Sequence, residues 1–273
     1  MRYYRWLLRV LLVSLVVLSS WVGWVGEPPA LATTLTEEQW NYLDSLSRKA
    51  YQAGTEGHLD QAEQYWTEIL DQMPDNAAAL SNRGNIRVNQ LKLKEALADH
   101  NQAVQLAPNV SDPYLNRGTA YEALGEWEKA IADYNRVLEI DPNDAMAYNN
   151  RGNAQAGQGE WKGAIADYQK ATELAPNFAF ARANYALALY QVGEHQDALR
   201  ELRNIVRKYP QFPDVRAALS AILWTDGKRG EAESNWVAVV GLDPRYKDLN
   251  WVKTIRRWPP ELVAALEKFL TLQ

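Results

Sequence analysis

The sequence predicts an all-α solenoid of six helix hairpins, and the first observation behind this prediction is a segment that occurs twice. Residues 116–118 read Asn-Arg-Gly, and the same three residues return at 150–152. Residues 130–134 read Ala-Ile-Ala-Asp-Tyr and return at 164–168, again 34 positions later. A fixed period of about 20 to 50 residues is typical of repeat proteins, in which each unit packs only on its neighbours.

The second observation is a proline that recurs with the same period and without insertion, at Pro74, Pro108, Pro142, Pro176, Pro210 and Pro244. An alanine lies twelve residues before each of them, at Ala62, Ala96, Ala130, Ala164, Ala198 and Ala232. A large or ring-bearing residue lies eight residues before each, at Trp66, His100, Tyr134, Tyr168, Leu202 and Trp236. Six consecutive units follow, and each proline is expected to end the second helix of its unit because proline cannot continue a helix.

The third observation is helical spacing in two segments of each unit. In the third unit the first segment is marked by Tyr114, Arg117, Gly118 and Tyr121. The second is marked by Ala130, Ile131, Tyr134 and Val137. Since both sets recur with the three-to-four-residue period of a helix face, each unit is predicted to be a hairpin of two helices.

A tight turn is expected between the two helices of each hairpin. Glycine occupies the same position of this turn in five units, at Gly57, Gly125, Gly159, Gly193 and Gly227. Glycine takes the left-handed conformation that ends a helix without Cβ strain. Leu91 stands at this position in the second unit, which predicts a looser turn there.

This pattern resembles the tetratricopeptide repeat, which has small residues at fixed positions of both helices, a bulky residue in the second helix and a proline near the end. The match covers about residues 43–246, with units that begin near residues 43, 77, 111, 145, 179 and 213. The resemblance implies a right-handed solenoid whose first helices line a concave groove that binds a protein or peptide segment. A polar lead-in at 33–42 precedes the array, and its Thr36 is expected to cap the first helix.

The same resemblance locates candidate peptide-binding residues on the first helices. Asparagine is the sixth residue of four units and the ninth residue of two, at Asn82, Asn116, Asn150 and Asn184 and at Asn85 and Asn153. A side-chain amide both donates and accepts hydrogen bonds, so it can pair with the backbone of an extended peptide. The alternative is that these amides solvate the helix face or bond the neighbouring repeat.

The last two units offer a candidate pocket for an apolar anchor side chain, formed by Phe180, Tyr190 and Trp224. The alternative for these three residues is core between repeats. The lysines and arginine of the family's clamp for chaperone C-termini are missing apart from Arg48, which argues against that role. Arg83, Arg117 and Arg151 recur 34 residues apart, and we interpret them as partners of an acid on the adjacent helix rather than as an anion site.

The first 32 residues are predicted to be a secretory signal peptide. Three arginines, Arg2, Arg5 and Arg9, precede an uncharged stretch from 10 to 25, and Ala30-Leu31-Ala32 supplies a cleavage site after Ala32. The alternative is an uncleaved membrane anchor. Both predict that the repeats lie beyond the cytoplasmic face, because positive charge stays inside.

The tail at 247–273 is predicted to hold a capping helix over the last repeat. Pro260 suits its first turn, and an apolar stripe follows at Leu262, Leu266, Phe269 and Leu270. Before it lies a basic and aromatic cluster in which Lys253, Arg256 and Arg257 accompany two tryptophans. This cluster predicts a contact with an anionic membrane surface or an acidic partner, and the alternative is a cap whose cations reach to solvent.

The leader and the tail together resemble exported tetratricopeptide proteins of cyanobacteria and of the chloroplast thylakoid lumen. That resemblance implies a location in the thylakoid lumen or the periplasm. It also implies a role in the assembly or maintenance of a membrane-associated, photosynthetic complex.

Composition and motifs argue against other classes of function. The net charge of −5 without an arginine stripe speaks against a nucleic-acid partner. The chain has no cysteine and three histidines in different registers, and it has no glycine-rich phosphate loop. The sequence therefore predicts no catalytic residue, metal, cofactor or small-molecule substrate. Two interpretations remain: a peptide-binding scaffold, and a membrane-anchored structural spacer without a specific peptide groove.

Overall fold

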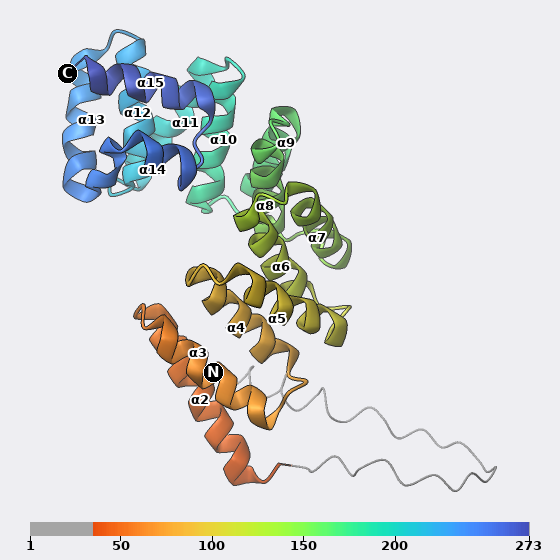
Figure 1. Ribbon diagram of the computed structural model, residues 1–273. Helices are drawn as coiled ribbons and strands as arrows, with labels where there is room; N and C mark the ends of the chain where they lie inside the picture. The colour runs from red at the N-terminus through yellow and green to blue at the C-terminus, as the bar shows by residue number, and fades with distance from the viewer. Residues whose placement is uncertain (1–34, 273) are drawn as a thin grey trace, which may run out of the picture. The chain divides into compact units, whose positions relative to one another are not determined.

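The computed structural model describes residues 35–272, and it confirms the predicted all-α solenoid of paired helices. These residues form fourteen α-helices and one short 3-10 helix, and none of them belongs to a strand (Figure 1). The chain divides into two compact units, 1–40 and 41–273. The predicted leader at 1–32 lies outside the described residues.

Six hairpins follow one another along the chain. Their helices are α2 (Glu37–Thr55) with α3 (Leu59–Gln72), α4 (Ala77–Asn89) with α5 (Leu93–Leu106), α6 (Ser111–Leu124) with α7 (Trp127–Ile140), α8 (Ala145–Gly157) with α9 (Trp161–Leu174), α10 (Ala179–Gln191) with α11 (His195–Lys208), and α12 (Pro213–Thr225) with α13 (Arg229–Leu242). The start of α2 lies in the first compact unit, where Thr36 and Gln39 exchange the two hydrogen bonds of a capping box. No described helix is both long and apolar enough to span a membrane.

The first helices of successive hairpins lie beside one another, as do the hairpins themselves. Helix α4 contacts α6, α6 contacts α8, and α8 contacts α10, while each second helix from α3 to α11 contacts the first helix of the next hairpin. We call the surface formed by α4, α6, α8, α10 and α12 the first-helix face.

The turns between paired helices are tight in all six hairpins. All five predicted glycines have φ between 74° and 87°. Leu91 has φ 62°, and its N–H bonds to Val88 O at 2.9 Å just as the N–H of Gly125 bonds to Glu122 O at 3.0 Å. The predicted looser turn at Leu91 is therefore wrong, because the backbone hydrogen bonds impose the left-handed conformation on a leucine at a cost of about 1–2 kcal/mol. Its side chain is 81% exposed, so no packing opposes this conformation.

The recurring Asn-Arg-Gly triplet is explained by ring packing inside each of the middle hairpins. A Cβ atom on Gly84, Gly118 or Gly152 would lie 2.5, 2.6 or 2.8 Å from the ring of His100, Tyr134 or Tyr168. Only glycine leaves space for the ring from the second helix. The two tyrosines reach through to the first helix, where Tyr134 donates to Glu122 at 3.1 Å and Tyr168 donates to Asn153 at 2.9 Å.

The predicted pairing of the recurring arginines with an adjacent acid is confirmed. Each guanidinium makes two hydrogen bonds of 2.6–2.9 Å to one carboxylate, in the pairs Arg83–Asp99, Arg117–Asp133 and Arg151–Asp167. A further nitrogen of each arginine donates to the preceding hairpin, at Thr67, Asn101 and Asn135. These arginines therefore fasten neighbouring second helices together.

The tail forms the predicted capping helix over the last repeat, and this helix also reaches the hairpin before it. A 3-10 helix (Pro244–Lys247) and α14 (Leu249–Thr254) turn the chain back, so that α15 (Pro260–Thr271) packs on α12 and also on α10 (Figure 1). Leu262, Leu266 and Phe269 are fully buried. The cap thus extends over the first-helix face of the last two hairpins, because its apolar stripe finds apolar partners there.

Buried Asp214 at the start of α12 holds this returning tail. Its carboxylate accepts hydrogen bonds from Tyr246 at 2.6 Å and from the indole of Trp258 at 2.9 Å. It also forms an ion pair with Arg256 at 2.8 Å. A carboxylate with only 4% of its side chain exposed needs such partners to remain charged.

Candidate functional site

The first-helix face has two parts that differ in what covers them. The part on α10 and α12 is covered by α15, and we call it the closed part. The part on α4, α6 and α8 has no helix packed over it among the described residues, and we call it the open part. The predicted peptide-binding residues are distributed over both.

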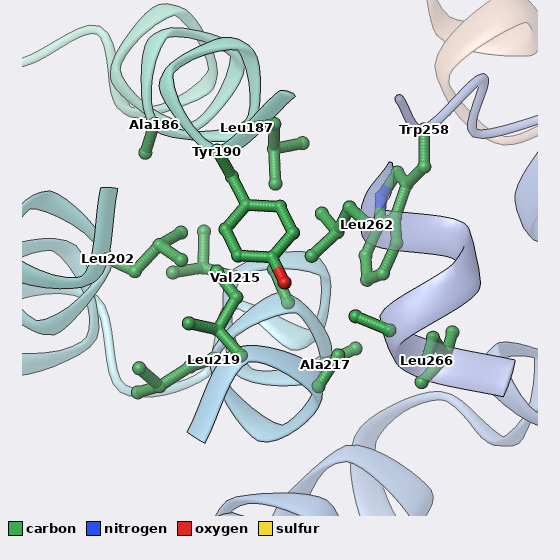
Figure 2. Close-up of a cluster of buried hydrophobic side chains, with 14 of the residues drawn as sticks. Ala186, Leu187, Tyr190, Leu202, Val215, Ala217, Leu219, Trp258, Leu262 and Leu266 are labelled. Atoms are coloured by element: carbon green, nitrogen blue, oxygen red, sulfur yellow. The ribbon is translucent and has the colours of Figure 1, made fainter. Parts of the chain in front are cut away.

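Two of the three predicted anchor-pocket residues are covered by the tail. Figure 2 shows Tyr190 of α10 gathered in one apolar cluster with Leu262 and Trp258 of the tail. Tyr190 is 6% exposed, and Trp224 meets Phe269 of α15 edge-on at 5.3 Å between ring centroids. The pocket predicted at these positions is therefore filled by the chain's own α15 and is not open to a partner. Apolar side chains are buried wherever a segment of the same chain reaches them.

The third anchor candidate, Phe180, remains accessible. Its side chain is 55% exposed and packs edge-on against Phe212, with ring centroids 5.1 Å apart. Met146 is the corresponding residue of the preceding hairpin and is 51% exposed. Exposed apolar side chains thus mark the start of both α8 and α10.

A side chain of the closed part binds the backbone of the segment that lies on it. Gln191, the last residue of α10, accepts a hydrogen bond from the N–H of Glu261 at 3.0 Å. This N–H belongs to the first turn of α15, where backbone donors have no partner within the helix. An amide of the first-helix face therefore recognises a peptide backbone within this molecule.

Three of the predicted asparagines of the first-helix face bond the neighbouring repeat, as the alternative interpretation foresaw. The amide nitrogen of Asn82 donates to Tyr51 at 2.9 Å, and that of Asn116 donates to Ser81 at 2.9 Å. Asn184 donates to both Asn149 and Asn153 at 3.0 Å.

These bonds leave part of the amide capacity unused. Asn85 is half-buried and forms no side-chain hydrogen bond within the described residues, and the same holds for the side-chain oxygens of Asn82 and Asn116. Asn150 accepts from Asn149 at 3.0 Å, and its amide nitrogen makes no bond among these residues. The face therefore retains both acceptors and donors.

The predicted basic cluster of the tail is largely engaged within the chain. Arg256 binds Asp214, as described above. Arg257 contacts Glu122 of α6 at 3.3 Å, and its guanidinium lies 5.2 Å from the ring centre of Trp127. Lys253 is exposed and forms no ion pair among the described residues. The sequence did not single out Asp214, Gln191 or Glu122, because their partners are separated from them by 44, 70 and 135 positions.

Glu122 links the two parts of the face. Its side chain is 15% exposed, and burial raises the pKa of its carboxyl group. Arg257 and the hydroxyl of Tyr134 both contact this carboxylate. Arg257 thus brings the tail into contact with α6, one of the helices of the open part.

The side chains of the described residues do not cluster in a way that would hold a metal ion. No group of three or more His, Asp or Glu residues within 35–272 has a suitable arrangement. The face is instead a surface of amides, one acid and exposed apolar residues.

Comparison with known proteins identifies the repeat. Models described as tetratricopeptide repeat match residues 48–111 and 145–178, and a TPR repeat model matches 120–159. A TPR repeat-containing thioredoxin of Arabidopsis thaliana is 29% identical over 104 residues, which are 38% of this chain and 27% of that protein. The chain therefore spans about a quarter of the length of this relative.

Solved structures share the fold. A tetratricopeptide repeat protein from Parabacteroides merdae superposes with a TM-score of 0.61 at 23% identity, over 85% of this chain and 93% of that one. YrrB, described as a TPR protein with an unusual peptide-binding site, superposes with a TM-score of 0.51 at 18% identity, over 74% of this chain and 97% of its own. At these identities the likeness concerns the fold alone.

Proposed function

Because the chain is a tetratricopeptide repeat protein, whose repeats form a protein-interaction domain, we propose that it binds a peptide segment of a partner on the open part of the first-helix face. One observation carries this proposal: Gln191 of that face already binds the backbone N–H of Glu261 in a segment that lies across α10 and α12. The described peptide-binding site of YrrB, which shares the fold, is consistent with it.

The chemistry of the open part suggests what the segment looks like. The unused amide groups of Asn85, Asn116 and Asn150 suit the backbone of an extended peptide, because a backbone offers alternating donors and acceptors. Met146 and Phe180 at the edge suit an apolar anchor side chain. This assigns the anchor to the accessible pair rather than to Tyr190 and Trp224.

The proposal includes a cellular role that rests on the leader and on the resemblance of the tail. The protein is exported beyond the cytoplasmic face, into the periplasm or a thylakoid lumen. There it serves as an assembly or maintenance factor for a membrane-associated complex, and a photosynthetic complex is the class we favour. It acts without a catalytic step, cofactor or metal. The second candidate is a membrane-anchored spacer, in which Lys253, an exposed cation of the tail, meets an anionic lipid surface.

A capture experiment with matched variants tests the peptide site. Residues 33–273 are immobilised and exposed to native extract, beside the same array with Asn116→Ala and Asn150→Ala. We expect the partner to be lost from this variant, and cross-linking with mass spectrometry then locates the bound segment on α4, α6 and α8.

The control is Asn101→Ala with Asn135→Ala. These residues also bond across repeats, by accepting from Arg117 at 3.0 Å and Arg151 at 2.7 Å, but they lie on second helices. The Asn116 and Asn150 substitutions remove one bond to the preceding repeat and one to Asn149, and the control removes two bonds between repeats. Since each such bond is worth about 1 kcal/mol, both variants should melt alike. Equal recovery of the partner by both variants would show that Asn116 and Asn150 do not contribute to the peptide site. Recovery of no partner with the unchanged array would favour the membrane-anchored spacer.

A further inference from the structure

The arginine row that links the middle hairpins stops before the last one. In the middle, Arg117 of α6 lies between Asn101 of α5 and Asp133 of α7 and binds both. Three repeats later the same register holds Arg203 in α11, Leu219 in α12 and Asn235 in α13. In the middle of the array the arginine thus belongs to the first helix, whereas in the last junction it belongs to the second helix α11.

A cavity is found where the guanidinium would lie. It has a volume of about 620 Å³ and opens between α11 and α13. Leu199, Val206 and Leu219 give it an apolar floor, and both leucines are at most 4% exposed. We call this cavity the α11–α13 cleft.

Positive charge dominates the walls of the cleft. Arg200, Arg203 and Arg207 line it from α11, and Glu231 is the one acid among its lining residues. This excess of positive charge stands out in a chain whose net charge is −5. Since opposite charges attract and an apolar floor excludes water, the cleft is complementary to an acidic segment with an apolar side chain.

The arginines are available to a new partner. Arg200 pairs with Asp197 at 2.6 Å, and Arg203 pairs with Glu231 at 2.7 Å, but in each pair both side chains are 39–64% exposed. Exposed ion pairs contribute about 0–1 kcal/mol, so a carboxylate from another protein can replace either acid. Within residues 35–272, Arg207 bonds only to the side chain of Asn204 on its own helix.

We propose that the α11–α13 cleft binds an acidic segment of a partner protein, with an apolar side chain on Leu219 and carboxylates against Arg200 and Arg207. The walls of the cleft are the second helices α11 and α13, and a first helix contributes Leu219 to its floor. Its occupant does not depend on the proposed peptide site, and the two surfaces can be engaged at once.

The proposal is tested with a variant in which the last junction is rebuilt to match the junction at Arg117. We call this variant the rebuilt junction. Arg203→Asn, Leu219→Arg and Asn235→Asp together reproduce the Asn101–Arg117–Asp133 arrangement, which folds in this same protein, and they return a guanidinium to the cavity. Lys170→Gln, an exposed cation of α9 paired with Glu173, is the control for a lost positive charge on a second helix outside the cleft.

The probe is the peptide acetyl-Glu-Glu-Leu-Glu-Glu-amide, and its leucine-to-alanine analogue reports on the apolar floor. Binding to the full chain is followed by NMR of the arginine Nε–H groups. We expect the resonances of Arg200, Arg203 and Arg207 to shift, the rebuilt junction to lose affinity by about tenfold or more, and the Lys170→Gln variant to bind unchanged. We also expect the alanine analogue to bind about tenfold more weakly, since it buries less apolar surface on the floor of the cleft.

Three outcomes would overturn the proposal. The first is the absence of any shift at millimolar peptide, and the second is equal affinity of the rebuilt junction. The third is self-association of the unchanged chain that disappears in the rebuilt variant, because the occupant would then be a second copy of the protein. Circular dichroism of the rebuilt variant verifies that a lost signal does not come from unfolding.

Discussion

The middle hairpins, α4 to α9, and the last two, α10 to α13, share one backbone plan and differ in the chemistry of their interiors. The middle ones are joined by polar contacts: an arginine of a first helix binds both the aspartate of its own hairpin and an asparagine of the preceding second helix, and Asn116 bonds the preceding first helix. The last two belong to one continuous apolar cluster that also takes in the tail. The difference explains why the first-helix face is open in the middle and closed at the end, since only an apolar surface attracts α15.

The largest effect is expected from breaking the closed part with a charge. Leu266 is fully buried in α15, so Leu266→Asp places an unpaired carboxylate in the apolar cluster and should destabilise the last two hairpins by about 4–5 kcal/mol. The middle hairpins should be affected much less, because repeats pack only on neighbours. Hydrogen exchange measured by mass spectrometry should show faster exchange in α10 to α15 and near-normal exchange in α4 to α7.

The matched control for Leu266→Asp is Glu267→Ala at the exposed neighbouring position. A uniform loss of protection over all six hairpins would contradict the distinction between the two regions. Unchanged protection of α10 and α12 would show that the tail does not hold them.

The second effect concerns the polar junctions of the middle. Arg117→Leu leaves the carboxylate of Asp133, which is 7% exposed, without its ion-pair partner, and should cost about 3–5 kcal/mol. Adding Asp133→Asn makes the junction resemble Leu219 with Asn235 in the last hairpin. The double variant should recover most of the loss, as chemical denaturation of the single and double variants will measure. If the two changes add without coupling, the ion pair is not what joins the hairpins.

A smaller effect is a dependence of stability on pH, which is expected from His100 in the middle hairpins and not from the corresponding residue of the last two. His100 is fully buried with both ring nitrogens unpartnered among the described residues, and burial lowers the pKa of its imidazole to about 4. The unfolded chain binds this proton near the ordinary pKa of about 6.5, whereas the folded chain does not until about pH 4. Stability is therefore lost as the pH falls from about 6.5 to 4, by up to about 3 kcal/mol.

Leu202 occupies the same position in α11 of the fifth hairpin, and a leucine side chain does not titrate. Denaturation at several pH values should show a slope in this window that His100→Tyr removes, because Tyr134 and Tyr168 fill the same place over a glycine in the next two hairpins. His58 is exposed, so His58→Gln serves as the control. A slope that survives in the His100→Tyr variant would assign the pH dependence to other groups.

Local interactions account for what could be predicted from the sequence. The turn glycines and the terminating prolines each act within a few residues, so they predict the hairpins without knowledge of the rest, and their recurrence every 34 residues gives the number of hairpins. The pairing of Arg117 with Asp133 was also within reach, because these residues lie 16 positions apart in one hairpin. Leu91 was mispredicted because the backbone bonds of the turn outweigh the preference of a single residue.

The state of the candidate site, by contrast, depends on contacts between distant parts of the chain. Asn82, Asn116 and Asn184 have the composition of a peptide-binding surface, and only their positions against Tyr51, Ser81 and Asn149 revealed the inter-repeat bonds. An amide on a helix can serve either purpose, so periodicity does not choose between them.

By itself the sequence determined the repeat, the hairpins and the helical, apolar nature of the tail. Only the tertiary structure decided that α15 turns back over α10 and α12, that Asp214 holds Arg256 and Trp258, and that a cavity opens above Leu219. An apolar stripe predicts that a helix will be covered, but it does not predict which surface covers it, because the hydrophobic effect has no direction. The choice of covering surface depends on the path of the chain and on which buried polar groups find partners along it.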